Sequence, residues 1–244
     1  MSLPNVTRYR LPAAKVARRA APPKYAIWHA TRGPKGSNQF LGTINWFTSA
    51  SNVHPTLQFG PSSDLLIGAD GKIAQFTDYA VERANWSAGY GESAALTYGA
   101  DEWGVSIEVA QSDALEAYTS AQVEAIAQVM AELNRAFSIP LTRLSYLDQL
   151  RAKPVPSGHV GHESTANGRR TGKSDPGDKF PWVQSLARAK AILEPPAPLS
   201  RRMDEDDAAL IYQERMWPYL VTNVTVTSLP ESGGRRVYEV RLPK

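Results

Sequence analysis

The sequence predicts one α/β (α+β) domain with a central mixed β-sheet flanked by helices. Three observations support this prediction. An apolar run typical of a buried strand, an Asp-Gly hairpin and a second strand-like run come first, and two segments with helical periodicity follow. The 244 residues, 42% of them hydrophobic, are enough to bury a substantial core. No window approaches the roughly 18 consecutive apolar residues of a membrane span.

The expected strands lie in the first half of the chain. Residues 25–29 (YAIWH) form a short apolar run after a Pro-Pro pair, which is typical of a buried strand that ends in a histidine. Residues 64–78 (DLLIGADGKIAQFTD) place two apolar runs around Asp-Gly, and glycine supplies the positive φ of a tight hairpin turn. Residues 103–111 (WGVSIEVAQ) predict a further strand. Functional sites in such sheets gather where strand ends meet loops.

Three helices are expected in the main domain. Residues 36–51 (GSNQFLGTINWFTSAS) suggest a short one. Residues 119–137 repeat apolar side chains at helical spacing, and Thr119 with Gln122 fits a capping box. Residues 181–193 begin with a proline in the first turn and stop before Glu-Pro-Pro.

Composition shifts divide the chain into four parts. Residues 1–23 are a basic arm without acidic residues, which suits an anionic partner or a solvated lead-in. The main domain covers residues 24–193, and a Pro-rich linker covers 194–200. Residues 201–244 predict a helix and a terminal hairpin. This extension is short for independent stability, so we expect it to pack on the main domain or on a partner.

The chain has no cysteine, so a metal site would need histidine, aspartate or glutamate ligands. His29, one histidine of the pair at 159 and 162, and Asp175 could form such a site, although two histidines three positions apart also occur by chance. Glu108 alternates with apolar neighbours on its predicted strand. It either faces a cleft, where burial would raise its pKa toward that of a general base, or faces solvent.

Five blocks occur in order over roughly residues 24–193: IWHATRG, SSDLLIGADGKIAQF, NWSAG, GVSIEVA and GHESTANGRRTGKSDPGDKFPW. Together they resemble the zinc-dependent N-acetylmuramoyl-L-alanine amidases. That family includes phage endolysins, bacterial recycling amidases and peptidoglycan recognition proteins, and the chain most resembles a phage endolysin.

The resemblance implies roles for single residues. His29, His162 and Asp175 match the zinc ligands, which selects His162 over His159. Lys173 matches the lysine that stabilises the reacting carbonyl, and Glu108 matches a proposed general base. Some relatives use a tyrosine where this chain has Ser63, and this difference points back to Glu108.

Substrate contacts are less well defined, because the chain has Ser62-Ser63-Asp64 and Trp86-Ser87-Ala88-Gly89 where relatives often carry histidines. The candidate contacts are Trp86, Ser87, Arg169 and Arg170. The two arginines could instead be solvated. His54 and His159 have no assigned role, and we expect each to support the structure rather than bind metal.

The implied activity is hydrolysis of the amide between the lactyl group of N-acetylmuramic acid and L-alanine of the stem peptide. The expected partner is bacterial peptidoglycan, the expected cofactor is Zn²⁺, and the expected state is a monomer. Without a signal peptide, the enzyme would be made in the host cytoplasm and reach the wall after holin-type release. The alternatives are a cytosolic recycling amidase and a non-catalytic peptidoglycan-binding or sensing module. Nucleic-acid binding has no supporting motif.

Overall fold

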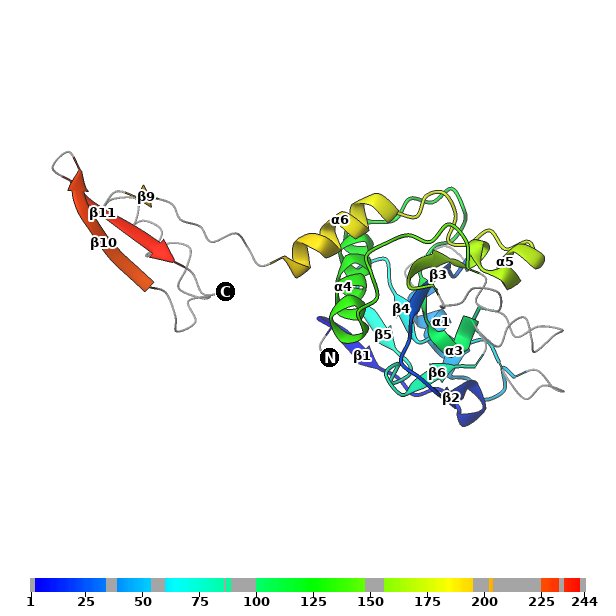
Figure 1. Cartoon of the computed structure of the whole chain (residues 1–244). Coiled ribbons are helices and arrows are strands. Elements are labelled where there is room, and N and C mark those ends of the chain that lie inside the picture. The colour runs from blue at the N-terminus through cyan, green and yellow to red at the C-terminus, as the bar shows by residue number, and fades with distance from the viewer. Residues whose placement is uncertain are drawn as a thin grey trace. The chain divides into compact units, whose positions relative to one another are not determined.

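The computed structural model describes residues 3–33, 39–53, 60–85, 87–88, 100–147, 156–194, 202–203, 225–232 and 235–241. The chain divides into two compact units, Met1–Ile192 and Leu193–Lys244. Figure 1 shows the helices and strands of each unit. Among the described helices, none combines the length and the apolar character needed to cross a bilayer.

The larger unit is built on a six-stranded sheet in the order β1-β5-β4-β7-β3-β8. The strands are β1 (Val6–Arg8), β3 (Tyr25–Ala30), β4 (Leu65–Ile67), β5 (Ile73–Gln75), β7 (Gly104–Val109) and β8 (Gly158–Gly161). Neighbouring strands are parallel except in the β4/β5 pair, which is antiparallel. The predicted mixed sheet is therefore confirmed.

The β4/β5 pair is the predicted Asp-Gly hairpin. Gly71 has a φ of 80°, and the Gly68 amide donates to the Lys72 carbonyl at 2.8 Å to close the turn. A side chain at position 71 would be strained at this φ and would also press on the Ala121 backbone. Glycine therefore fixes the hairpin, and the hairpin sets the register of β4 beside β7.

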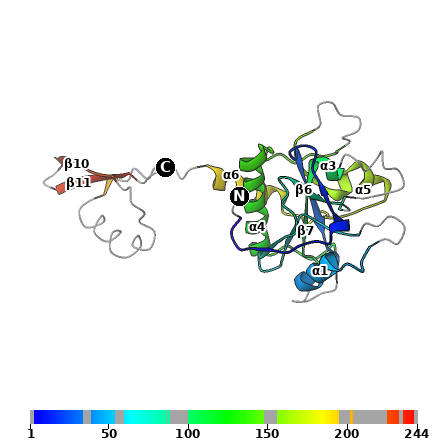
Figure 2. The ribbon, with the colours of Figure 1, turned by 90° about the horizontal axis from the view of Figure 1, so that it is seen from below.

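Helices cover both sides of this sheet, with α4 and α5 on opposite sides (Figures 1 and 2). The α-helices among the described residues of the unit are α1 (Gln39–Thr48), α3 (Ala100–Trp103), α4 (Ser120–Phe137), α5 (Ala166–Arg170) and α6 (Trp182–Leu193). The capping box of α4 forms as predicted, because Thr119 Oγ1 accepts from the Gln122 amide and Gln122 Oε1 accepts from the Thr119 amide. Ile126, Met130 and Leu133 form part of its buried face.

The basic segment at the N-terminus differs from the sequence expectation, because it is folded into the unit rather than separate from it. Its strand β1 pairs with β5, and β2 (Val16–Arg18) pairs antiparallel with β6 (Glu82–Ala84). Leu11, which follows β1 in the sequence, belongs to a buried hydrophobic cluster, and Lys15 and Arg19 are buried as well. The sequence suggested that these two cations meet an anionic partner or are solvated, whereas each has buried partners within the protein.

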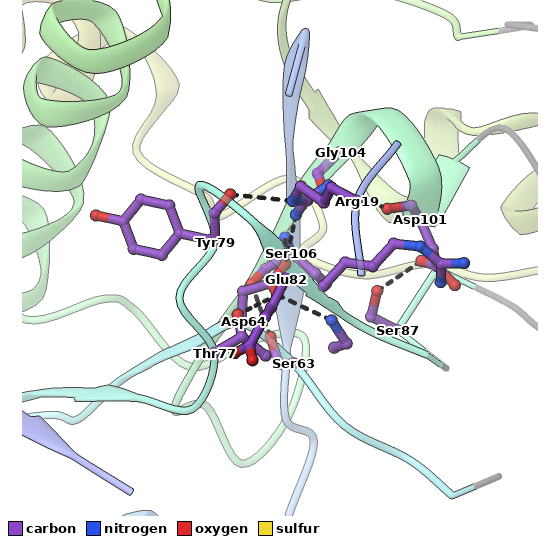
Figure 3. A network of polar contacts seen from close by, with 12 residues as sticks. Arg19, Ser63, Asp64, Thr77, Tyr79, Glu82, Ser87, Asp101, Gly104 and Ser106 are labelled. Atoms are coloured by element: carbon purple, nitrogen blue, oxygen red, sulfur yellow. Dashed lines mark hydrogen bonds and ion pairs between the residues drawn. The ribbon is translucent and has the colours of Figure 1, made fainter. Parts of the chain in front are cut away.

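Arg19 is neutralised inside the protein by Asp64, 3.3 Å away (Figure 3). The guanidinium also donates to the carbonyls of Tyr79 and Gly104 at 3.0 and 2.6 Å. The Asp64 carboxylate accepts from the Ser106 amide on β7 at 2.8 Å. Because both charges are fully hydrogen-bonded, this buried pair is tolerated and joins the N-terminal segment to the central strands.

The smaller unit contains a three-stranded antiparallel sheet in the order β10-β11-β9. Its strands are β9 (Arg202–Met203), β10 (Thr225–Ser232) and β11 (Arg235–Arg241). The pair β10 and β11 forms the hairpin that the sequence predicts. Most of the predicted linker and of the predicted helix after it lies outside the described residues.

Candidate functional site

His29 stands at the carboxyl end of β3, where it is 2% exposed. All six residues of β3 are buried, so the strand has a core on both faces. Side chains alternate along a strand, so His29 shares a face with Ile27 while Trp28 points to the other face. The sheet thus presents a buried imidazole at the edge where parallel strands end.

His162 reaches the same edge from the neighbouring strand. β8 runs parallel to β3 and ends at Gly161, and His162 opens the 3-10 helix η2 (His162–Ser164) directly after it. Thr165 donates its hydroxyl to the His162 carbonyl at 2.9 Å. A Cβ at Gly168 would collide with that carbonyl oxygen, so α5 approaches this closely only with glycine.

Asp175 comes to the histidines from the loop after α5. The Glu163 amide donates to the Asp175 carbonyl at 2.9 Å, which ties this loop to the His162 segment. The next carbonyl, of Pro176, accepts from Arg32 Nη2 and from Tyr118 Oη, each at 3.2 Å. Arg32 follows β3 closely, so these contacts also tie the loop to the strand of His29.

Three possible ligand atoms converge. Nδ1 of His29 and Nδ1 of His162 are 3.1 Å apart, and Oδ2 of Asp175 lies 3.3 Å from the first and 3.1 Å from the second. Ligands about 2.1 Å from a tetrahedral zinc ion are separated by about 3.4 Å. The spacing of the three atoms therefore suits ligation of one zinc ion, and no other such His/Asp/Glu group occurs in the described part of the chain.

The protonation states also suit a cation. Burial, together with the neighbouring His162, lowers the pKa of His29 to about 4, so its imidazole is neutral near pH 7. Burial alone would raise the pKa of Asp175, but hydrogen bonds from His162 and His29 outweigh it and hold the pKa well below its usual range. The site therefore offers a carboxylate and a neutral imidazole at neutral pH.

Glu108 lies beside this cluster on β7, where it is the register partner of His29. Burial and, to a smaller extent, the charge of Asp175 raise its pKa to about 8, while Lys173 opposes both effects. Within the described residues, its Oε2 atom is buried without a hydrogen-bond partner. The side chain faces the site rather than solvent, which decides between the two alternatives that the sequence left open.

A cavity of about 590 Å³ opens over these groups and is lined by His29, Glu108, His162, Lys173 and Asp175. Ser87 also lines it, with its hydroxyl donating to Asp101 at 2.6 Å. The five candidate ligand and catalytic residues, from three of the sequence blocks, thus line one cavity. Trp86 and His54 lie outside the described residues.

The two candidate arginines do not line this cavity. The Arg169 guanidinium lies 4.6 Å from the ring centroid of Tyr146, and Arg170 Nη2 donates to Asn167 Oδ1 at 2.9 Å. Asn167 itself lines the cavity. Arg170 therefore reaches the cavity wall through Asn167, and direct substrate contact by either arginine stays a prediction.

His159 is separated from the cluster by the sheet itself. It pairs with Ala26, so it shares the face of Trp28, whose indole Nε1 donates to its Nδ1 at 3.3 Å. Burial lowers the pKa of His159 to about 3. This histidine is a neutral member of an aromatic group beneath the sheet.

Sequence reasoning missed several residues around the site. Trp46 and Arg32 line the cavity, and Tyr118 holds the Asp175 loop from outside it. Trp46 could have been considered from the sequence, because it is a large aromatic residue in the short predicted helix. Tyr118 lies 58 residues from Pro176 and carries no local signal.

The profile of the N-acetylmuramoyl-L-alanine amidase family matches residues 19–178. Solved structures share the fold. An AmpD derivative has a TM-score of 0.50 and 23% identity, over 79% of this chain and 97% of that one. The catalytic domain of XlyA has a TM-score of 0.51 and 15% identity, over 76% and 99%. A mutant endolysin from Bacillus subtilis has a TM-score of 0.50 and 17% identity, over 76% and 98%.

No curated protein matches the chain. The family profile covers well over half of the sequence, and its range includes the candidate metal ligands together with Glu108 and Lys173. The chain therefore belongs to the N-acetylmuramoyl-L-alanine amidase family.

Proposed function

We propose that this chain is a zinc-dependent peptidoglycan hydrolase. It cleaves the amide between the lactyl group of N-acetylmuramic acid and L-alanine of the stem peptide. The observation that carries the proposal is the convergence of three ligand atoms beside Glu108 in one cavity of an amidase-family chain. The alternative of a non-catalytic binding module needs no buried carboxylate at that position.

His29, His162 and Asp175 would hold the zinc ion. Their donor set of two imidazoles and one carboxylate is one that catalytic zinc uses when a fourth position stays open. When bound there, zinc supplies a Lewis acid for the amide carbonyl and lowers the pKa of a water molecule toward neutrality.

Glu108 is the proposed general base. Its carboxylate takes a proton from the attacking water and returns it to the amine of the leaving alanine. The pKa of about 8 refers to the metal-free protein, and a cation in the adjacent cluster lowers it, because opposite charge favours the carboxylate. A bound cation therefore favours the ionised form of Glu108, which is the form that accepts the proton.

Lys173 is the proposed electrostatic helper. It lines the same cavity, and its position is fixed because its backbone amide donates to the Gly168 carbonyl at 2.8 Å. Its ammonium group stabilises the negative charge that develops on the amide oxygen. Such a contact contributes on the order of 3 kcal/mol to the transition state.

We further propose that the biological role is that of a phage endolysin, which reaches the wall through a holin-type pore. The support is the sequence resemblance, and the alternative is a cytosolic recycling amidase. The two roles differ in substrate, since a lysin acts on intact wall and a recycling enzyme acts on soluble fragments. Comparing hydrolysis of intact sacculi with that of soluble muropeptides decides between them.

The activity is tested by incubating the protein with purified peptidoglycan and measuring new N-terminal alanine. We expect release that a chelator abolishes and added zinc restores. The matched control is Glu108→Gln, which should bind zinc but release nothing. Zinc-loaded wild-type protein that binds peptidoglycan without releasing alanine would contradict the proposal and favour the binding module.

A further inference from the structure

Trp46 stands out on α1 because it is both exposed and part of the candidate active site. Its side chain lines the same cavity as His29 and Glu108, yet the residue is 50% exposed. The indole stacks on Phe47, with centroids 5.7 Å apart and an interplanar angle of 26°. Phe47 is buried against Phe76 in the core, so it gives the indole a fixed support.

The backbone under this indole is anchored by a buried lysine. Lys15 Nζ donates to the carbonyls of Trp46 and Phe47 at 3.3 and 2.9 Å, and Asn52 donates to the Trp46 carbonyl as well. These carbonyls belong to the last turn of α1, which has no further helical donors and carries partial negative charge. The N-terminal segment therefore holds the end of α1, and with it Trp46, at the cavity rim.

The wall formed by the segment of α5 and its following loop has different chemistry. Asn167, Thr171 and Lys173 line the cavity there, and Lys173 brings a positive charge. α1 and α5 lie well apart from each other in Figure 2. The cavity thus has an aromatic contribution from one element and a polar, cationic contribution from another.

We propose that Trp46 is the platform for the sugar ring of the substrate. This inference rests on the proposed function, because a muramoyl-peptide has a neutral sugar on one side of the scissile amide and a peptide with free carboxylates on the other. The carboxylates favour the wall that carries Lys173. A pyranose ring has a flat face of C–H groups, and a fixed, half-exposed indole matches that face.

The test uses two substrates with the same scissile amide. One is N-acetylmuramoyl-peptide, and the other is a D-lactoyl-peptide without the sugar ring. We expect Trp46→Ala to raise KM for the muramoyl substrate about tenfold with a much smaller change in kcat, and to leave KM for the lactoyl substrate unchanged. Trp46→Phe should recover most of the affinity, because it keeps an aromatic face.

The control variant is Leu41→Ala, which removes another exposed apolar side chain from α1 that does not line this cavity. It should leave both KM values unchanged. An equal rise in KM for both substrates with Trp46→Ala, or no rise for either, would overturn the proposal.

Failure of the proposed function can be distinguished from failure of this inference. If the wild-type protein cleaves neither substrate, calorimetric titration with the muramoyl-peptide and the lactoyl-peptide still decides the sugar platform. Weaker binding of the muramoyl-peptide alone to Trp46→Ala upholds it, and an equal change for both peptides, or no change, rejects it.

Discussion

His29 and Glu108 are register partners on the neighbouring parallel strands β3 and β7. Paired residues of adjacent strands project from the same face of the sheet, so the pairing places a candidate metal ligand and a candidate base side by side without help from any loop. The register of β7 is fixed in turn by β4, where Leu66 is the partner of Glu108. A rigid sheet, rather than a mobile loop, therefore sets the distance between the two groups.

Glu108→Gln tests the role of this carboxylate. The substitution keeps the shape but removes the base, so we expect hydrolysis to fall roughly 10²- to 10⁴-fold while zinc content is unchanged. In the wild type, kcat/KM should rise with pH to a plateau, because only the ionised form accepts a proton. The apparent pKa of that rise should lie below the metal-free value of about 8. The same rise in the residual activity of the variant would exclude Glu108 as its source.

His162→Ala and His159→Asn separate the two histidines that stand three positions apart in the sequence. Removing His162 takes away one of three converging donors, and we expect the zinc stoichiometry after dialysis to fall close to zero. His159→Asn keeps an acceptor for Trp28 on the other face of the sheet and should retain zinc. Metal analysis of both purified proteins checks the pair, and zinc loss in the asparagine variant would refute the assignment.

Tyr118→Phe tests whether the Asp175 loop is pre-positioned for metal. The variant removes the hydroxyl that donates to the Pro176 carbonyl but keeps the ring, which packs edge-on against Phe180. Loss of a contact that supports a ligand typically costs 10- to 100-fold in metal affinity, so we expect a zinc Kd about tenfold higher. Competition with a chromogenic chelator measures it, and thermal unfolding of the metal-free protein controls for a general loss of stability.

Much of this site was predictable from the sequence because its ligands follow strands that have strong local signals. His29 ends an apolar run, and the Asp-Gly hairpin fixes the strand beside β7. The position of the N-terminal segment was not predictable in this way. Its five basic residues suggested an arm for an anionic partner or a solvated lead-in, whereas Lys15 and Arg19 are buried against partners 31 to 85 residues away. Pairing at that sequence distance leaves no periodic pattern to detect.

Asp64→Asn tests the buried ion pair of that segment. The variant leaves the Arg19 guanidinium inside the protein without its ion-pair partner, and breaking a buried pair from one side typically costs about 3–5 kcal/mol of unfolding free energy. The matched control is Asp70→Asn, because the Asp70–Lys72 pair at 2.7 Å is exposed on both sides. An exposed pair contributes little to stability, because solvent screens it. Urea unfolding of both variants should show this contrast, and equal losses would contradict it.

The last prediction concerns acid stability of the metal-free protein. The pKa of His159 is lowered from 6.5 to about 3 by burial, so below pH 6.5 the unfolded chain binds a proton that the folded chain does not. Stability from this group is therefore complete above pH 6.5 and is lost as the pH falls toward 3. Between pH 7 and pH 5 the loss amounts to about 2 kcal/mol.

His159→Asn cannot take up this proton, so its unfolding free energy should decline by about 2 kcal/mol less than that of the wild type over the same interval. Urea unfolding at pH 7 and pH 5 measures how much unfolding free energy each protein loses over this interval. Subtracting the loss of the variant from that of the wild type cancels the constant cost of the substitution and the contribution of His29. Identical losses would show that His159 is protonated in the folded protein and that its side chain is not sealed beneath the sheet.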